Sequence, residues 1–81
     1  MLSRNKIIDS IGISGLSLEK GNGYYYFIYD VPEKNIFETH SVYVNSLNQL
    51  NLQSWLYEAA EFLKKFGLNI NVLEIIKREN L

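Results

Sequence analysis

Few side chains in this chain could carry out chemistry, and the single histidine, His40, is the first of them. An imidazole titrates near neutrality, so it can serve as a general base. Serines and aspartates are available for a triad, but no nucleophile-elbow sequence and no diagnostic spacing accompany them. A histidine beside a core is more often a hydrogen-bonded structural residue, and we predict no catalytic residue and no enzymatic activity.

Two carboxylates, Glu58 and Glu61, form the next candidate pair. Both fall on the polar side of a predicted helix, and Lys65 follows Glu61 by four residues, which is a favourable spacing for a surface ion pair. Acid–base chemistry on a glycoside would need the two carboxylates to line a cleft. One small sheet and one helix hardly provide a cleft, so we interpret both as solvated surface residues.

The triplet Gly21-Asn22-Gly23 superficially resembles a phosphate-binding loop. A dinucleotide-binding loop continues as GxGxxG and opens a helix, and neither feature follows here. Glycine and asparagine accept positive φ angles at low cost, so a tight turn is the simpler interpretation.

Composition excludes further classes of site. Cysteine is absent and histidine occurs once, which excludes disulfides, thiolate metal sites and histidine-rich zinc sites, and we predict no cofactor and no metal. The formal net charge is -1, from 8 basic and 9 acidic side chains. Nucleic-acid binding needs a clustered positive patch, and the small pairs Lys64-Lys65 and Lys77-Arg78 do not form one. A nucleic-acid partner is therefore disfavoured.

The length of 81 residues predicts one domain over residues 1–81. A domain this small is marginally stable unless it packs densely or self-associates. The N-terminal apolar run is broken by Asp9 and Gly12, unlike a signal peptide, and no stretch is long enough to span a membrane. We expect a cytoplasmic protein.

The first half of the chain predicts strands joined by tight turns. Residues 3–11 fit a short helix between Ser3 and Gly12, and a strand over residues 7–13 fits their β-branched content equally well. Residues 15–19 alternate like a strand. Residues 24–31 and 36–44 predict an antiparallel hairpin, closed by a turn over residues 32–35.

The second half predicts one strong helix and one ambiguous element. Residues 52–66 form an amphipathic helix, with Asn51 as its N-cap and Gly67 as its C-cap, and Trp55 lies on its apolar side. Residues 69–77 favour a strand because of their β-branched content, and a short helix capped by Asn71 is the alternative. The predicted class is α+β: three to four antiparallel strands and one main helix, in a ββαβ-like order.

Pairing around the turn separates the hairpin residues into two faces. It places Val31 opposite Ile36, Tyr29 opposite Glu38, Phe27 opposite His40 and Tyr25 opposite Val42. The more aliphatic face should pack beneath Trp55. The other face combines tyrosines with hydroxyl side chains, which a core would exclude, and should remain open. We predict a partner-binding surface made of four residues there and one on the polar side of the helix: Tyr24, Tyr26, Phe37, Tyr43 and Tyr57.

This architecture resembles that of small phage-encoded inhibitors, including anti-CRISPR proteins and RNA-polymerase inhibitors. The motifs Gln53-Ser54-Trp55-Leu56-Tyr57 and Ile76-Lys77-Arg78-Glu79-Asn80 are similar to the C-terminal half of a type I-F anti-CRISPR protein. Glu58-Ala59-Ala60 continues the helix where such a protein has a glycine-rich break, so no binding residue is carried over. The resemblance implies a non-enzymatic binder that blocks a host protein surface in the host cytoplasm.

Two classes of function therefore stay open. The first is an interaction protein: a phage or mobile-element inhibitor, or a toxin-neutralising immunity protein. The second is a structural or assembly protein that forms a homodimer through its sheet. Its partner would be a host or cognate protein, or a second copy of the chain.

Overall fold

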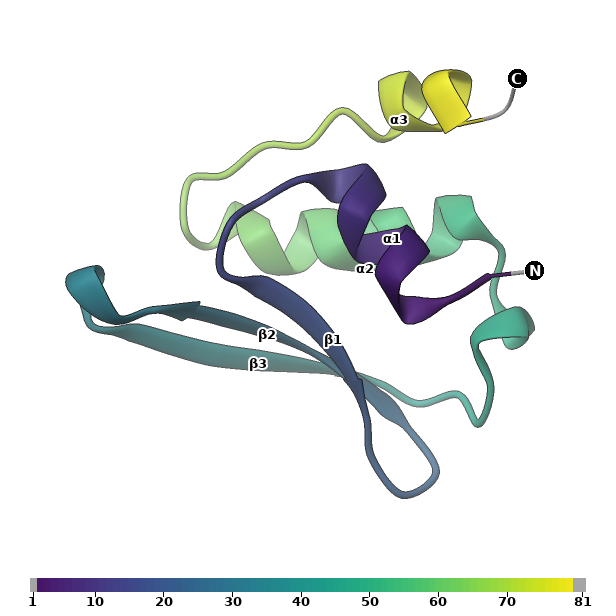
Figure 1. Ribbon diagram of the computed structural model, residues 1–81, viewed down its shortest axis with the longest axis horizontal. Coiled ribbons are helices and arrows are strands. Elements are labelled where there is room, and N and C mark those ends of the chain that lie inside the picture. Colours follow the sequence, from purple (N-terminus) through teal and green to yellow (C-terminus); the bar gives the residue numbers. More distant parts are fainter. Residues whose placement is uncertain (1, 80–81) are drawn as a thin grey trace.

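The fold places three helices on one side of an antiparallel sheet, in a computed structural model that describes residues 2–79 (Figure 1). The helices and strands, in chain order, are α1 (Arg4–Ile11), β1 (Leu16–Lys20), β2 (Tyr25–Val31), β3 (Ile36–Val42), α2 (Leu52–Lys64) and α3 (Val72–Glu79). Short 3₁₀ turns, Pro32–Lys34 and Leu47–Gln49, lie on either side of β3. The predicted α+β class is confirmed.

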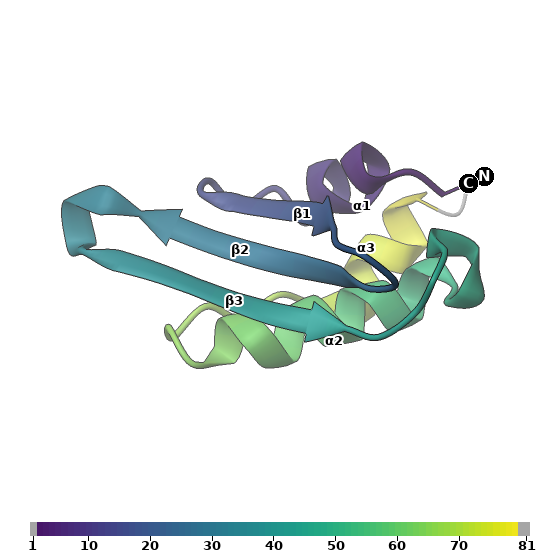
Figure 2. The same ribbon diagram turned by 90° about the horizontal axis from the view of Figure 1, so that it is seen from below.

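The strands form a meander in the order β1-β2-β3. In Figure 1, α1 and α2 lie directly above this sheet and α3 packs on them, farther from the strands, and the view from below in Figure 2 shows the opposite face of the sheet without a covering element. Within residues 2–79, every strand belongs to this single sheet of three, which is the lower bound of the prediction.

The helix α1 lies between two capping residues that the sequence indicated, Ser3 and Gly12. The Ser3 hydroxyl accepts a hydrogen bond from the Lys6 amide at 3.0 Å, and Gly12 closes the helix with φ of 70°. Ile7 and Ile11 are buried on the side that faces the core. Of the two alternatives that the sequence left open for this segment, the helix is the one that forms.

The hairpin has the predicted register. All four predicted pairs, from Val31 with Ile36 to Tyr25 with Val42, are paired in the sheet. Asn35 takes the left-handed conformation, with φ of 56°, that closes the turn. The strands are slightly shorter than predicted, since β2 begins at Tyr25 and β3 ends at Val42.

The core lies between α2 and the sheet, and Trp55 is at its centre. Its side chain is fully buried, and its ring meets Phe27 edge-on with 6.1 Å between ring centroids. The indole Nε1–H donates to the Leu47 carbonyl at 2.9 Å, which satisfies the one polar group of the ring. The predicted packing of Trp55 against the Phe27 face is confirmed.

The helix α2 begins at its predicted cap, because the Asn51 side chain accepts from the Ser54 amide. It ends at Lys64, two residues earlier than predicted. Gly67 (φ 73°) donates to the Lys64 carbonyl and Leu68 donates to the Leu63 carbonyl, which are the two bonds of a Schellman motif. The glycine thus ends the helix as its position indicated.

The predicted strand over residues 69–77 is wrong, and the alternative, a helix capped by Asn71, is the correct one. The Asn71 side chain accepts from the Glu74 amide at 3.0 Å, and α3 runs from there to Glu79. Val72 and Ile75, three residues apart, both point to the core, as in a helix. The last element among the described residues is therefore a helix packed on α2 and not the final strand of a ββαβ order.

Candidate functional site: the open face of the sheet

The surface of the sheet that faces away from the helices is called the open face below. Pairing of the strands places on it Ser17 and Glu19 from β1, Tyr26, Ile28 and Asp30 from β2, and Phe37, Thr39 and Ser41 from β3, with Tyr24 and Tyr43 beside the ends of β2 and β3. The opposite side chains, Tyr25, Phe27 and Tyr29, are all buried beneath the helices. The alternation of strand residues therefore separates aromatic rings of the core from aromatic rings that face solvent.

Three tyrosines gather at one end of the open face. The ring of Tyr24 lies 5.7 Å from that of Tyr26 and 6.0 Å from that of Tyr43, measured between centroids. Tyr43 is 81% exposed, whereas Tyr24 and Tyr26 are half-buried. The three predicted residues therefore form one aromatic surface, which we call the tyrosine cluster.

Glycine at position 21 lets the Tyr24 ring lie against the β1–β2 turn. A Cβ atom added at Gly21 would be only 2.4 Å from Cζ of Tyr24, so a larger residue would displace the ring. The tight turn predicted at residues 21–23 thus also fixes the position of one ring of the tyrosine cluster.

Phe37 lies on the same face but at the opposite end of β3. It pairs with Asp30 across the hairpin and is 64% exposed. Its ring makes no aromatic contact with the tyrosine cluster within residues 2–79. The structure therefore separates Phe37 from the cluster although both belong to the open face.

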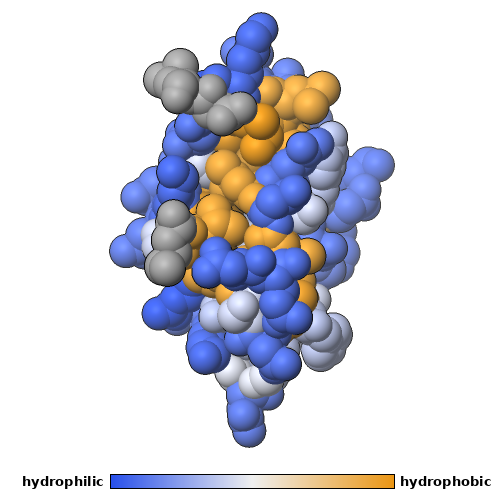
Figure 3. All heavy atoms as spheres, turned by 90° about the vertical axis from the view of Figure 1, so that its right-hand side faces the viewer, coloured by the Kyte–Doolittle hydropathy of each residue, from blue (hydrophilic) through white to orange (hydrophobic). Residues whose placement is uncertain are grey.

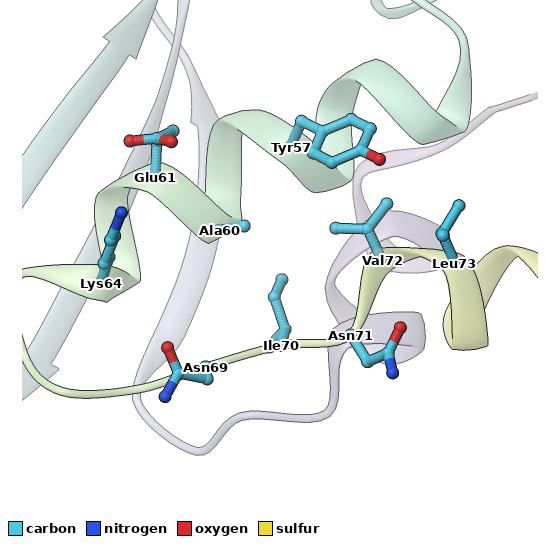
Figure 4. Close-up of a pocket in the computed structure, with 9 residues that line it drawn as sticks. All are labelled: Tyr57, Ala60, Glu61, Lys64, Asn69, Ile70, Asn71, Val72 and Leu73. Carbon is cyan, nitrogen blue, oxygen red and sulfur yellow. The ribbon is translucent and has the colours of Figure 1, made fainter.

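Tyr57 lies on a different surface from the four other predicted residues. It projects from α2 toward α3, is 48% exposed, and lines a groove of about 530 Å³ between these helices (Figure 4). Ile70 and Leu73 lie on the far side of this groove, and Leu73 is 65% exposed. Sequence reasoning missed Leu73 because the segment was read as a strand. Helical spacing, with Val72 and Ile75 inward, would have placed it outward.

A further apolar surface occurs at the end of the molecule where α2 begins and α3 ends. Figure 3 shows hydrophobic atoms that form a continuous patch there, bordered by hydrophilic ones. Leu52 and Ile76 line a smaller hollow, of about 230 Å³, between these two helices. This surface is aliphatic, in contrast to the tyrosine cluster.

The charged side chains on the open face are both acidic. Glu19 is bound to Arg4 of α1, with 3.2 Å between the guanidinium nitrogen and the carboxylate oxygen, and Asp30 is exposed beside Phe37. No lysine or arginine occupies a strand position on this face in the described part of the chain. Sequence reasoning missed the contribution of β1, although the inward alternation of Leu16 and Leu18 predicts that Ser17 and Glu19 face outward.

His40 joins the sheet to α2. Its Nε2 atom lies 2.9 Å from a Glu58 carboxylate oxygen, and its ring stacks on Phe62 with centroids 5.6 Å apart. Among residues 2–79 its hydrogen-bond partner is thus a carboxylate on the helix and not a serine hydroxyl. The arrangement has the geometry of a structural link between β3 and α2.

No group of three or more metal-ligating side chains occurs among the residues that the structure describes. Over the same residues, the helices are all too short or too polar to cross a membrane.

No protein-family model matches the chain, and neither a curated protein nor a solved structure is significantly similar to it. The resemblance to phage-encoded inhibitors therefore stays a prediction. Its first motif, residues 53–57, lies on α2, and its second, residues 76–80, covers the end of α3, with Asn80 outside the described residues.

Proposed function

We propose that this protein is a non-enzymatic binding module that recognises another protein through the open face of its sheet. The observation that carries the proposal is the exposure of aromatic rings on a face that no helix covers. Tyr43 and Phe37 remain 81% and 64% exposed, while the rings on the other side of the same strands are buried. Tyrosine and phenylalanine are enriched at protein interfaces, and the best-contributing residues are often tyrosines.

The N-terminal segment is not the occupant of this face. The helix α1 packs in the helical layer, where Ile7 is fully buried, and so lies on the other side of the sheet. This removes one of the simplest explanations for an uncovered aromatic surface. A protein partner then provides the remaining source of burial for the rings.

The charges on the open face favour a protein over a nucleic acid. Stacking on single-stranded nucleic acid uses exposed aromatic rings as well, but it is combined with cations that neutralise phosphates. Here Glu19 and Asp30 are the charged residues among the paired strand positions of this face. An inhibitor of a host protein and a toxin-neutralising immunity protein would both use such a surface, and the proposal covers either.

Alanine substitution of Tyr24, Tyr26 and Tyr43 together is expected to abolish partner binding and to leave the fold intact. None of these three side chains belongs to the buried core, so their removal takes little from it. One tyrosine hot spot contributes about 2 kcal/mol or more, which corresponds to a loss of affinity of at least about thirtyfold. Affinity capture from the source cells with the wild type, followed by titration of the captured protein, measures this loss.

Two further variants make the experiment decisive. Tyr57→Ala removes an equally polar aromatic residue from the other side of the molecule and should bind as the wild type does. Gly21→Ala displaces the Tyr24 ring without deleting it and should weaken binding less than the triple variant. A folded triple variant that binds with unchanged affinity would contradict the proposal. A loss of binding confined to Tyr57→Ala would contradict it too, and would place the binding surface in the groove between α2 and α3.

A further inference from the structure

The outer edge of β3 is a second unpartnered feature of the sheet. In the order β1-β2-β3, this strand pairs on one side only, and within residues 2–79 no strand lies beyond it (Figure 2). It is seven residues long, its register with β2 is unbroken by a bulge, and it contains neither proline nor lysine. Bulges, prolines and lysines are among the features that keep edge strands from pairing with another chain, and β3 has none of these three. The one acidic side chain on its helix-facing side is Glu38, so the edge is open to a strand that can accommodate this carboxylate.

The sequence of β3 is complementary to itself in one antiparallel register. A two-fold axis perpendicular to the sheet keeps each residue on its own face, so the axis must lie midway between one residue of the strand and the same residue of the second copy. Thr39 is the midpoint of Ile36–Val42, and an axis there pairs all seven residues. It places Ile36 opposite Val42 of the second copy, and threonine opposite threonine, both of which are favourable cross-strand pairs.

Charge selects the same register. With the axis at Thr39, Glu38 of each copy lies opposite His40 of the other. An axis at Glu38 would place the two glutamates against each other, which is destabilising, and an axis at His40 would place the two histidines together. The hydrogen bond to Glu58 uses Nε2 of His40 and leaves Nδ1 without a partner among the described residues. Glu38, which is exposed, would approach His40 on that same helix-facing side of the sheet.

We infer that the β3 edge pairs with the β3 edge of a second copy of this chain, in the antiparallel register centred on Thr39. The two sheets then join into one, and their open faces lie side by side. Phe37 comes opposite Ser41 of the second copy, and this serine is paired on its other side with Tyr26 of its own chain. The isolated phenylalanine of one copy thereby extends the tyrosine cluster of the other. The carboxylate of Glu38 discourages other strands and selects this partner.

The absence of cysteine from the chain allows a direct test of this register. In Thr39→Cys, each chain carries one thiol, and the proposed axis brings the two thiols together across the strands, within the Cα separation that a disulfide spans. Mild oxidation should convert this variant quantitatively into a linked dimer. Ser14→Cys, in an exposed position away from β3, is the control and should link only slowly, by random collision.

The neighbouring positions test the register more closely. Phe37→Cys and Ser41→Cys should each stay unlinked when oxidised alone and should form a mixed disulfide when combined. Self-linkage of Phe37→Cys, or linkage of Thr39→Cys no faster than that of Ser14→Cys, would overturn the inference. A wild type that sediments as a monomer across the micromolar to millimolar range would overturn it as well.

Reversal of the charge at Glu38 tests the contribution of the two proposed Glu38–His40 pairs. Glu38→Lys should weaken the dimer by about tenfold or more, because the two-fold axis places the changed pair at two positions in the dimer. Asp9→Lys makes the same change of charge on α1 and should leave dimerisation unchanged. If the folded Glu38→Lys variant dimerises as the wild type does, the proposed register is wrong.

The inference does not rest on the proposed function, and the two can fail separately. Alanine at Tyr24, Tyr26 and Tyr43 should remove partner binding and leave the dimer, whereas Glu38→Lys should weaken the dimer and leave recognition by the tyrosine cluster. A monomeric wild type whose binding to another protein is lost in Glu38→Lys would instead assign the edge to a strand of that protein.

Discussion

Replacement of Trp55 by alanine is expected to lower the free energy of unfolding by about 3–5 kcal/mol. The side chain is fully buried, its ring meets both Tyr25 and Phe27 edge-on, and its Nε1–H is bonded to the Leu47 carbonyl. A domain of 81 residues has a total stability of about 4–12 kcal/mol, so the variant should lie close to its unfolding threshold.

Urea denaturation followed by circular dichroism measures this loss, since the variant has no tryptophan left for fluorescence. The matched control is Tyr57→Ala, which removes a half-exposed ring from the same helix and should change stability by no more than about 0.5 kcal/mol. If Trp55→Ala unfolds within about 1 kcal/mol of the wild type, the ring does not fill the core as described.

Alanine at Gly15 is expected to destabilise the protein by about 2–4 kcal/mol. Gly15 has φ of +89°, which side chains rarely adopt, and a Cβ atom there would be 2.8 Å from the backbone carbonyl oxygen of Asp30. That carbonyl belongs to β2 and cannot move without disturbing the sheet. The Asp30 amide also donates to the Gly15 carbonyl, at 2.9 Å, so a shift of the backbone would strain this bond.

Gly67→Ala separates the two causes of the stability loss in Gly15→Ala, which are the unfavourable φ angle and the close contact of the added Cβ atom. Gly67 also has positive φ, +73°, but nothing lies within 4 Å of an added Cβ atom. It should therefore show only the conformational cost, about 1–2 kcal/mol. Equal losses in the two variants, measured by thermal and urea denaturation, would show that the contact with Asp30 contributes nothing.

Local signals were sufficient to predict most of the fold. The caps Ser3 and Asn51 fixed the starts of two helices, because their side chains satisfy backbone amides that no helical carbonyl can reach. Asn35 fixed the hairpin turn, and through it the register of β2 with β3. The register determines which side chains share a face, so the residues of the open face could be predicted once the turn was placed.

The last element could not be predicted with the same means. Residues 69–77 are rich in β-branched side chains, which favour a strand, and their apolar positions fit both periods. The Asn71 cap and the burial of Val72 and Ile75 against α2 decide for the helix. Contacts between distant segments outweigh intrinsic propensity in so short an element.

The candidate site was predicted in part. Sequence alternation placed Tyr24, Tyr26, Phe37 and Tyr43 on one face, and the structure has them there. Alternation could not show that three of these rings lie next to one another, because that depends on the orientation of each side chain. For Tyr24 this orientation is set by the turn at Gly21. The groove that Tyr57 lines could not be predicted either, because the segment that forms its other side was predicted as a strand and is a helix.

The position of α3 has a consequence for the way in which the protein comes apart. Arg78 donates to the Ser10 carbonyl at 2.8 Å. The two residues are 68 positions apart, so this bond joins the C-terminal helix to the N-terminal one. A helix of eight residues is not stable alone, so α3 exists only while it is docked on α1 and α2. Its amide protons should therefore exchange with solvent before those of α2. Its departure would expose the apolar sides of both other helices while the sheet is still folded, and this partly opened form is the one from which aggregation would start.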